Sequence, residues 1–437
     1  MDDQDRPSRR RHVLEILTDA HHEIPGELNC ATVRLSIDKT LSREYGVGGG
    51  VRVKRCSRRF NMKTRFASLA FGAIGFIACV VFAPVIHAQQ YIYTNNDVQT
   101  PTLNSTTAMS VSSTGQGSVI NTYSTGGTGG GGGYFALVGV AAAKTASNTC
   151  VFVSNSGSSN IAAFTVNSSN GALTTVAGSP FPSGGSGDEQ YGIGLAVGAN
   201  KALFAGNTNN DSISTLAIKA DCSLHLLQTL NVAGTPTGMK VTHNSKYLLV
   251  GYNGEVDSFQ IVPSTGALTE LGPFGTEGAA AGVDISCDDS TAYFGDAATD
   301  IQVEVFSIAG NGKLTEINNF TNDSGENSNN VLLSADGQTL FVSNTMSAGV
   351  TTLAVGSGGS LTYGSSTKLN GSFSFVLDSA TVKSGARIFV SENGPAQIGV
   401  LKASGTTLTE VAGSPFSLGV NNANVVSIAA VPTKVCP

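Results

Sequence analysis

Two short phrases that mix apolar and polar positions recur along the chain at a nearly constant interval. One is apolar-apolar-Val-small-Asn, as in VFVSN ending at Asn155 and LFVSN ending at Asn344. The other is Gly-x-Leu-Thr, and both recur every 44 to 52 residues, so the pattern predicts about six homologous units. The leucines of the complete and degenerate Gly-x-Leu-Thr copies are Leu173, Leu224, Leu268, Leu314, Leu361 and Leu408.

Each unit reads as four short strands. The second strand of a unit is apolar on both faces, as expected for a strand covered by neighbouring sheets. Asp-Gly between two apolar runs is a strong hairpin signal, and Asp336-Gly337 provides one. Four strands in about 45 residues is the period of a β-propeller blade. In the fifth unit the expected strands are Asn330–Leu333, Thr339–Ser343, Gly349–Val355 and a fourth that begins at Leu361.

The two ends of the repeat region supply the parts of one more blade. Asn424–Val431 matches a first strand, and Tyr91–Asn95 matches a second strand with no first strand before it. Two strand-like stretches follow, near Ala108–Ser112 and Ser118–Tyr123. We expect these segments to pair, which closes the ring and leaves no open sheet edge. The predicted fold is therefore all-β, a seven-bladed β-propeller whose ring is closed by the C-terminal strand.

A different pattern precedes the repeats. The basic stretch Met62–Arg65 leads into an uninterrupted apolar run, Phe66–Ile86, and the small residue Ala88 follows. This order predicts a signal peptide over residues 62–88 that is cleaved after Ala88. The alternative is an uncleaved membrane anchor, because the run is long enough to span a bilayer.

The domain scheme follows from these patterns. Residues 1–61 show no clear period, and we interpret them as a non-native or disordered prefix to a protein that starts at Met62; a cytoplasmic extension is the alternative. Residues 89–437 form the propeller, with the Gly-rich run 126–133 as a flexible linker. We expect a secreted or periplasmic protein that contacts a membrane only through an uncleaved signal segment.

Composition and charge narrow the functional classes. The chain has 53 glycines among 437 residues, which argues against helical bundles because glycine destabilises helix interiors. Residues 1–65 hold 14 Lys and Arg against 9 Asp and Glu, whereas the rest holds 11 against 22. Arg387 is the one arginine after residue 65. Phosphate contacts need clustered Lys and Arg, so we expect no nucleic-acid partner.

One unit carries a resemblance to a known family. It reads CVFVSNSGSSNIAAFTVNSSNGALTTVAGSPF from Cys150, and part of it returns as TEVAGSPF over Thr409–Phe416. Over residues 89–437 the chain resembles the lactonase-family seven-bladed propellers, which include 6-phosphogluconolactonase-like and muconate-cyclase-like enzymes. It is also similar to exported propellers with YVTN-type repeats. The resemblance implies a propeller in which His, Arg and Glu side chains around the central channel handle an anionic lactone.

The chain departs from that pattern at the expected site. The corresponding blade openings, Thr237–Lys240 and Asn329–Leu332, contain no Arg or His. His243 falls in a turn, His225 in an outermost strand, and Arg387 just before a second strand. We therefore assign no catalytic residue and keep two hypotheses: a non-catalytic module that binds a sugar-like small molecule or a protein, and a lactone hydrolase. The missing Arg and His favour the first.

Polar residues gather in the loops that enter the first strands, and these loops are expected to form one rim of the channel. Carboxylate and amide oxygens there suit a sugar, a peptide or a hard cation such as Ca²⁺. We expect no cofactor, with Ca²⁺ as the alternative, and we assign no metal ligand. The predicted ligand-binding residues are Glu189, Tyr191, Glu277, Glu326, Asn329 and Asn422.

Four cysteines lie within the predicted propeller: Cys150, Cys222, Cys287 and Cys436. In an exported protein they permit disulfides, with three full pairings. Cys150 and Cys436 fall in turns of adjacent blades. We therefore predict a Cys150–Cys436 bridge that would lock the ring closure.

Overall fold

The structure is a computed structural model, and its described residues belong to one of two compact units, Phe82–Pro437. The predicted prefix 1–61 and signal peptide 62–88 lie outside the described residues. In the part of the chain that the structure describes, no helix is long and apolar enough to cross a membrane. The described ranges are 90–99, 101–131, 138–188, 192–198, 201–297, 301–321, 328–345, 347–370, 373–380, 387–393, 395–421, 423, 427–434 and 436.

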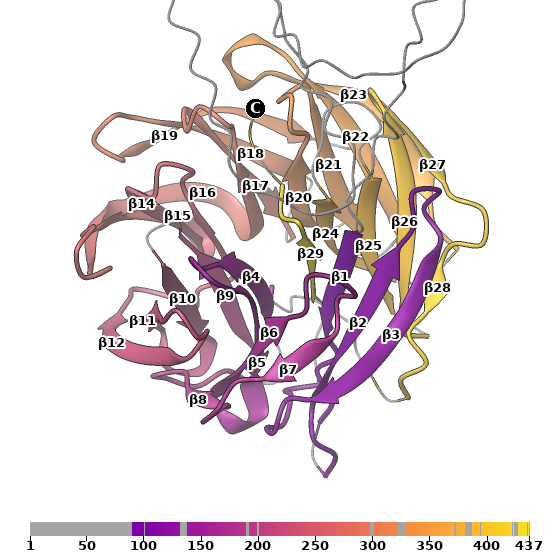
Figure 1. The fold of residues 1–437 in the computed structure, drawn as a ribbon. Coiled ribbons are helices and arrows are strands. Elements are labelled where there is room, and N and C mark those ends of the chain that lie inside the picture. Colours follow the sequence, from indigo (N-terminus) through magenta and orange to yellow (C-terminus); the bar gives the residue numbers. More distant parts are fainter. Residues whose placement is uncertain are drawn as a thin grey trace, which may run out of the picture. The chain divides into compact units, whose positions relative to one another are not determined.

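Seven antiparallel blades surround a central axis, and the first strand of each blade is innermost (Figure 1). Neighbouring first strands contact each other around the whole circle, from β4 to β24 and β29. The predicted seven-bladed β-propeller is confirmed. The short 3-10 helices η1, η2 and η3 cover Ser156–Ser158, Thr208–Asn210 and Ser357–Gly359.

The strands of the composite blade are β29 (Ser427–Val431), β1 (Gln90–Asn95), β2 (Ser105–Val111) and β3 (Gly117–Ser124). Blade one holds β4 (Val140–Lys144), β5 (Thr149–Asn155), β6 (Asn160–Val166), β7 (Leu173–Thr175) and β8 (Phe181–Pro182). Blade two holds β9 (Ile193–Val197), β10 (Ala202–Asn207), β11 (Ser212–Ile218) and β12 (Leu224–Asn231). Blade three holds β13 (Gly238–Val241), β14 (Tyr247–Gly251), β15 (Asn253–Ile261) and the first part of β16 (Leu268–Ile285).

Blade four holds the second part of β16 with β17 (Thr291–Asp296), β18 (Ile301–Ile308) and β19 (Leu314–Thr321). Blade five holds β20 (Ser328–Leu333), β21 (Thr339–Asn344), β22 (Gly349–Val355) and β23 (Leu361–Lys368). Blade six holds β24 (Phe373–Ala380), β25 (Arg387–Asn393), β26 (Gln397–Ser404), β27 (Thr407–Glu410) and β28 (Phe416–Ser417).

The ring closes as the sequence predicts. β29 pairs antiparallel with β1, so that Tyr93 faces Ala429 in the register, and β1 pairs in turn with β2. The C-terminal strand is thus the first strand of the blade whose other strands come from the N-terminal side. This pairing gives β1 hydrogen-bonded neighbours on both sides.

The cores lie between neighbouring blades rather than within one blade. One cluster joins Phe152 and Ile161 of blade one to Leu195 and Leu203 of blade two, all at most 4% exposed. Burying such side chains stabilises by about 1.5–3 kcal/mol each. Because both faces of a second strand are covered, β10 is buried along its whole length.

Backbone conformation and close packing explain why glycine recurs at the first position of the Gly-x-Leu-Thr phrase. Gly171 and Gly312 have positive φ values of 72° and 84°, which glycine adopts at no steric cost. A Cβ at Gly171 would lie 2.3 Å from the Tyr91 ring, and one at Gly312 would lie 2.4 Å from the Tyr247 ring. These two turns therefore lie against an aromatic ring of the preceding blade.

Two local expectations are corrected. The Gly-rich run is not a free linker over its described residues, because Gly129 N–H donates to Val98 O at 2.7 Å and Gly130 N–H to Asp97 Oδ1 at 2.9 Å. A Cβ at Gly129 would lie 2.4 Å from the Asp97 backbone, so these glycines allow close packing. The rim loop expected around Glu277 is instead continuous strand, since β16 pairs with β15 up to Ala279 and with β17 from Ala280.

The predicted Cys150–Cys436 bridge is wrong. Cys150 pairs with Cys222, with Cα atoms 5.6 Å apart, and Cys287 pairs with Cys436, with Cα atoms 5.3 Å apart. The first bridge links the start of β5 to the turn before β12 in the next blade. The second bridge forms because the chain continues after β29, away from blade one, and reaches the β16–β17 turn of blade four.

Candidate functional site

A cavity of about 530 Å³ occupies the centre of the ring. Residues of the first strands β4, β9, β13, β16, β20 and β29 line it. Many of these residues are small or apolar, such as Ala142, Gly194 and Val283. Small residues are needed here because seven strands converge, and they leave room for a ligand.

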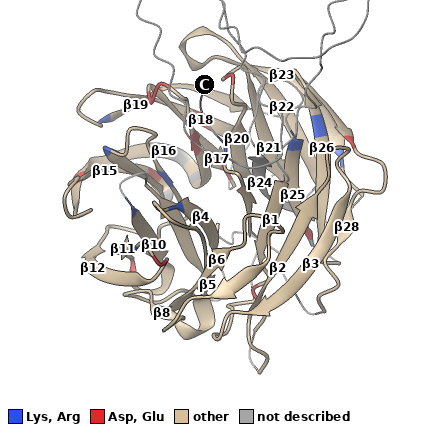
Figure 2. Ribbon diagram, viewed as in Figure 1, with Lys and Arg blue, Asp and Glu red and all other residues tan. Residues whose placement is uncertain are grey.

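Cationic side chains gather at one end of this cavity. Lys144 ends β4, Lys201 lies in the β9–β10 turn, His243 lies in the β13–β14 turn, and Lys434 follows β29. We call this end, defined by Lys144, Lys201, His243 and Lys434, the tail mouth. Lys240 of β13 also lines the cavity. None of the described lining residues is a carboxylate, and charged residues are sparse over the rest of the described ring (Figure 2).

Asp284, at the end of β16, holds two of these lysines. Its carboxylate lies 3.1 Å from Lys240 Nζ and 2.5 Å from Lys434 Nζ, and it accepts the Leu333 N–H at 2.8 Å. The Asp284 side chain is 1% exposed. Burial alone would raise the pKa of Asp284, but the Lys240 and Lys434 ammonium groups hold that pKa below its usual range. Asp284 therefore stays charged and fixes both lysines.

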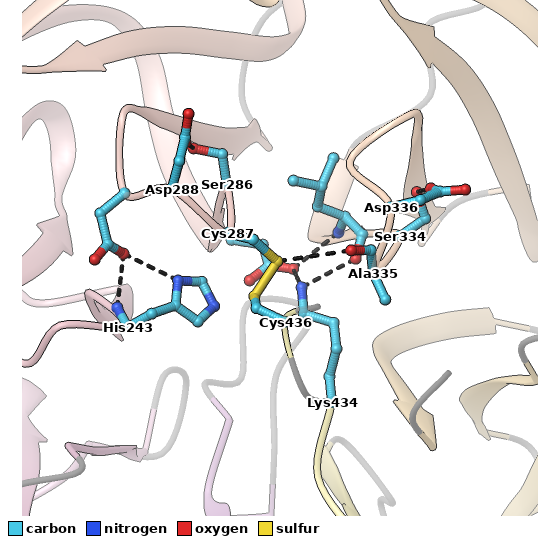
Figure 3. Close-up of a disulfide and its surroundings, with 12 residues drawn as sticks. His243, Ser286, Cys287, Asp288, Ser334, Ala335, Asp336, Lys434 and Cys436 are labelled. Carbon is cyan, nitrogen blue, oxygen red and sulfur yellow. Dashed lines mark hydrogen bonds and ion pairs between the residues drawn. A yellow bond between two sulfur atoms is a disulfide. The ribbon is translucent and has the colours of Figure 1, made fainter. Parts of the chain in front are cut away.

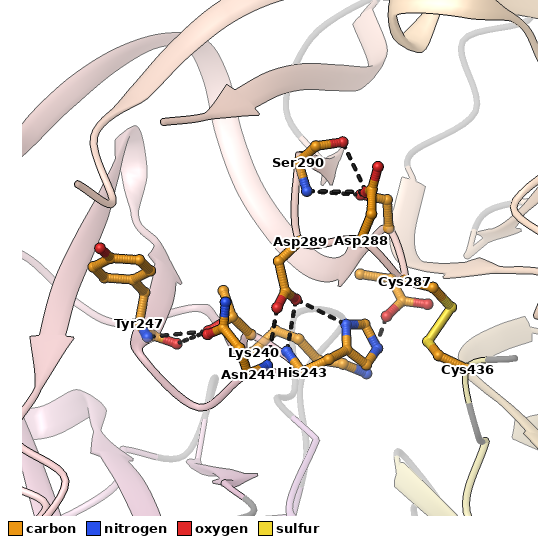
Figure 4. Close-up of polar contacts among 12 residues, drawn as sticks. Lys240, His243, Asn244, Tyr247, Cys287, Asp288, Asp289, Ser290 and Cys436 are labelled. Carbon is orange, nitrogen blue, oxygen red and sulfur yellow. Dashed lines mark hydrogen bonds and ion pairs between the residues drawn. A yellow bond between two sulfur atoms is a disulfide. The ribbon is translucent and has the colours of Figure 1, made fainter. Parts of the chain in front are cut away.

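His243 forms a second polar pair with Asp289 of the β16–β17 turn. The Nδ1 atom of His243 lies 2.9 Å from Asp289 Oδ1, which also accepts the His243 backbone N–H at 2.7 Å (Figure 4). The Asn244 N–H donates to Asp289 Oδ2 at 2.9 Å. The His243 side chain is 28% exposed, so the ring is held at one edge and reachable at the other.

The C-terminal tail crosses the tail mouth from the composite blade to blade four (Figure 3). Lys434 donates to Leu333 O at 2.9 Å besides pairing with Asp284, and its side chain is 8% exposed. Two residues later the tail is bonded to the β16–β17 turn through Cys287–Cys436. Blades three, four and five and the tail thus meet at this end of the cavity.

The sequence-predicted site residues lie largely outside the described part of the chain. This holds for Glu189, Tyr191, Glu326 and Asn422; Glu277 lies within β16, where its side chain is not described. Asn329 lines the cavity and is 5% exposed. These ligand-binding assignments stay predictions.

Arg387 and His225, which the sequence analysis also considered, lie away from the tail mouth. Arg387 donates to Gln90 Oε1 at 3.2 Å, to Ser112 O at 2.9 Å and to Ser113 O, so it joins blade six to the composite blade. His225 lies on the outer strand β12, as expected. The cluster of lysines was missed because its members are far apart in the sequence. Their shared signal is position, at or just after the end of a first strand.

The fold and the central cavity define a seven-bladed β-propeller with a ligand-sized pocket on its axis. A family model described as Lactonase, 7-bladed beta-propeller matches residues 147–281 and 251–374. The chain belongs to this lactonase family of seven-bladed propellers. A comparison with curated proteins finds no match.

Similar solved structures carry the same fold. One is a candidate 6-phosphogluconolactonase from Bacteroides fragilis, with a TM-score of 0.65, 17% identity, and coverage of 79% of this chain and 99% of that chain. Another is the periplasmic gluconolactonase of Pseudomonas aeruginosa, with a TM-score of 0.63, 16% identity, and coverage of 80% and 100%. A Lactobacillus plantarum protein matches with a TM-score of 0.64, 15% identity, and coverage of 78% and 99%. At these identities the likeness concerns the fold alone.

Proposed function

We propose that this protein is a non-catalytic, exported binding module of the lactonase family, and that it holds a small sugar acid in the central cavity. The observation that carries the proposal is the set of four lysines on the cavity wall, with no carboxylate among the described lining residues. Asp284 balances only part of this charge. A carboxylate ligand would complete the neutralisation.

The rest of the cavity suits a polyhydroxylated ligand. Its volume of about 530 Å³ falls in the usual range of small-molecule sites. Asn329 and Asn330 of β20 line the cavity, and sugar hydroxyls can both donate to and accept from amides. Export is supported by the basic stretch and apolar run of the predicted signal peptide 62–88, by the two disulfides and by the periplasmic structural neighbour.

A second candidate, lactone hydrolysis, is favoured by the His243–Asp289 pair. Asp289 accepts a hydrogen bond from the Nδ1–H group, which leaves Nε2 as the basic atom of the ring. A base in this arrangement would take a proton from a water that attacks a lactone carbonyl. The protonated imidazole would then return that proton to the ring oxygen, which leaves as the new hydroxyl. The nearby lysines would favour the carboxylate product.

Calorimetric titration of the purified protein with gluconate, and with glucose as the neutral control, tests the binding proposal. We expect gluconate to bind and glucose not to bind. The double variant Lys144→Gln/Lys201→Gln removes two exposed charges at the tail mouth and should weaken gluconate binding three- to tenfold, about 0.7–1.4 kcal/mol. The matched control Lys368→Gln removes an exposed charge on the outer strand β23 and should leave binding unchanged.

Three outcomes contradict the proposal. Equal binding of gluconate and glucose would remove the role of charge, and equal binding by the double variant would remove the role of the tail mouth. Hydrolysis of gluconolactone above its spontaneous rate, lost in His243→Gln, would establish the hydrolase instead.

A further inference from the structure

Three metal-ligating side chains from distant parts of the chain meet at the tail mouth. The ligand atoms of His243, Cys287 and Cys436 all lie within 4.8 Å of one another. Among the residues that the structure describes, this is the one group of three such side chains. Its members come from the β13–β14 turn, the β16–β17 turn and the C-terminal tail (Figures 3 and 4).

The imidazole is already oriented as in many metal sites. Asp289 accepts at 2.9 Å from Nδ1, and since a carboxylate only accepts hydrogen bonds, Nδ1 carries the proton and Nε2 keeps its lone pair. The ring lies between Asp289 and the disulfide in Figure 4. A histidine that ligates a metal through one nitrogen almost always donates from the other to a carboxylate or carbonyl in this way.

The tail does not depend on the disulfide alone for its position. Lys434, two residues before Cys436, pairs with the buried Asp284 and donates to Leu333 O. None of these contacts involves the sulfur atoms, so we expect them to hold the tail when the sulfur–sulfur bond opens. We therefore expect Cys436 to stay close to Cys287 and His243 in the reduced protein.

We propose that reduction of the Cys287–Cys436 disulfide creates a zinc(II) site made of two thiolates and His243 Nε2. A dithiol donates two electrons and two protons to the disulfide and becomes a disulfide itself. Zinc(II) then displaces the two thiol protons, and a water takes the fourth position. Once the bond is open, the two sulfurs can separate to about 3.8 Å, the distance that tetrahedral geometry with metal–sulfur bonds near 2.3 Å requires.

The types of ligand determine which metal should bind, and the burial of the sulfurs determines which disulfide should be reduced first. Two thiolates and an imidazole suit zinc(II) rather than Ca²⁺ or Mg²⁺, which take oxygen ligands. Cys150 and Cys222 are both 0% exposed, whereas Cys287 and Cys436 are partly exposed. A mild reductant should therefore open Cys287–Cys436 first, and Cys150–Cys222 is an internal control.

Cobalt(II) titration of the reduced protein tests the site, because a thiolate–cobalt bond gives an intense charge-transfer absorption. The full-length protein is reduced with a phosphine without oxygen, freed of reductant and titrated with Co²⁺. We expect one equivalent to bind with this absorption and zinc(II) to displace it, while the oxidised protein shows none. The double variant Cys150→Ser/Cys222→Ser should retain the absorption, and Cys287→Ser should lose it.

Two variants that keep the disulfide separate the site from a general effect on folding. His243→Gln should bind Co²⁺ at least tenfold more weakly after reduction. Asp289→Asn should bind it 10- to 100-fold more weakly, the usual effect of losing the partner of a ligating histidine. Both can be checked for folding in the oxidised state before reduction. Absence of the absorption in the reduced protein, or its loss only in the Cys150/Cys222 variant, overturns the proposal, as does unchanged affinity in His243→Gln.

Discussion

Asp257 and Asp284 are both buried carboxylates, but their surroundings shift their pKa values in opposite directions. Asp284 faces two ammonium groups, which outweigh its burial and keep its pKa low. Asp257 on β15 is 2% exposed, and burial together with the charges of Glu270 and Glu255 raises its pKa to about 8. The two residues therefore respond to pH in different ranges.

Replacing Asp257 by asparagine should flatten the dependence of stability on pH. Between its ordinary pKa and about 8, folded Asp257 keeps a proton that the unfolded chain has lost, so stability falls as pH rises, by up to about 1.4 kcal/mol per unit. The asparagine side chain cannot titrate, and it can still accept the Ser258 N–H that Asp257 accepts at 2.6 Å. Urea unfolding at pH 5, 6.5 and 8 should show that the free energy of unfolding of Asp257→Asn rises relative to that of the wild type as the pH increases.

The control for this prediction is Asp221→Asn. Hydrogen bonds from Ser223 lower the pKa of the exposed Asp221, so its titration falls below this pH range. Its slope between pH 5 and 8 should match that of the wild type. An Asp257→Asn slope equal to that of the wild type would contradict the raised pKa.

The lysines of the tail mouth show what the sequence could not reveal about single residues. Lys144, Lys240 and Lys434 follow no motif, and only closure of the ring brings them together. The blade openings at 237–240 and 329–332, which the family resemblance singles out, line the cavity. What could not be predicted was that the tail would add Lys434 from the opposite side of the ring.

At the level of elements, the repeat predicted the blades because each repeated turn needs the same backbone conformation. The glycine of every complete Gly-x-Leu-Thr copy has a positive φ: Gly171, Gly266, Gly312 and Gly359. The strands predicted for blade five match β20 to β23 within about two residues. The continuity of β16 and the two disulfide pairings were not predictable from the period. They depend on how turns of neighbouring blades meet in space, and the sequence pattern carries no record of that.

Replacing Gly312 by Ala tests whether the Gly-x-Leu-Thr turn joins blades or only reverses the chain. Its φ of 84° strains any residue with a Cβ, and that Cβ would lie 2.4 Å from the Tyr247 ring, whose hydroxyl donates to Gly310 O at 2.8 Å. We expect a loss of about 2–4 kcal/mol in the free energy of unfolding, measured in urea.

Gly337→Ala is the matched control for this substitution. Gly337 has a similar φ of 71°, but a Cβ there would meet nothing within 4 Å. It should therefore show the backbone strain alone, about 1–2 kcal/mol. If the two variants lose the same amount, the turn does not depend on its contact with the preceding blade.

On the scale of the whole molecule, two separate features of the C-terminal end hold the ring together. The strand β29 closes the ring by pairing with β1. The tail beyond it crosses the tail mouth and is bonded to blade four through a disulfide that spans 149 residues. A strand pairing removes an open sheet edge, whereas a cross-link mainly restricts the unfolded chain. Removing the strand and removing the cross-link should therefore have different effects on folding.

Two truncations separate these features. Ending the chain at Val431 keeps β29 but removes the tail and the Cys287–Cys436 bridge, and we expect a folded monomer that is about 2–5 kcal/mol less stable. Ending it at Ala423 also removes β29 and leaves β1 with an unpaired edge in the middle of the ring, where Ile92 and Tyr93 are 0% exposed. That variant should aggregate or lose cooperative unfolding, as followed by size-exclusion chromatography and thermal melting. Aggregation of the variant that ends at Val431 would mean that the tail is also needed to keep the ring closed. A folded monomer from the variant that ends at Ala423 would mean that β29 is not needed.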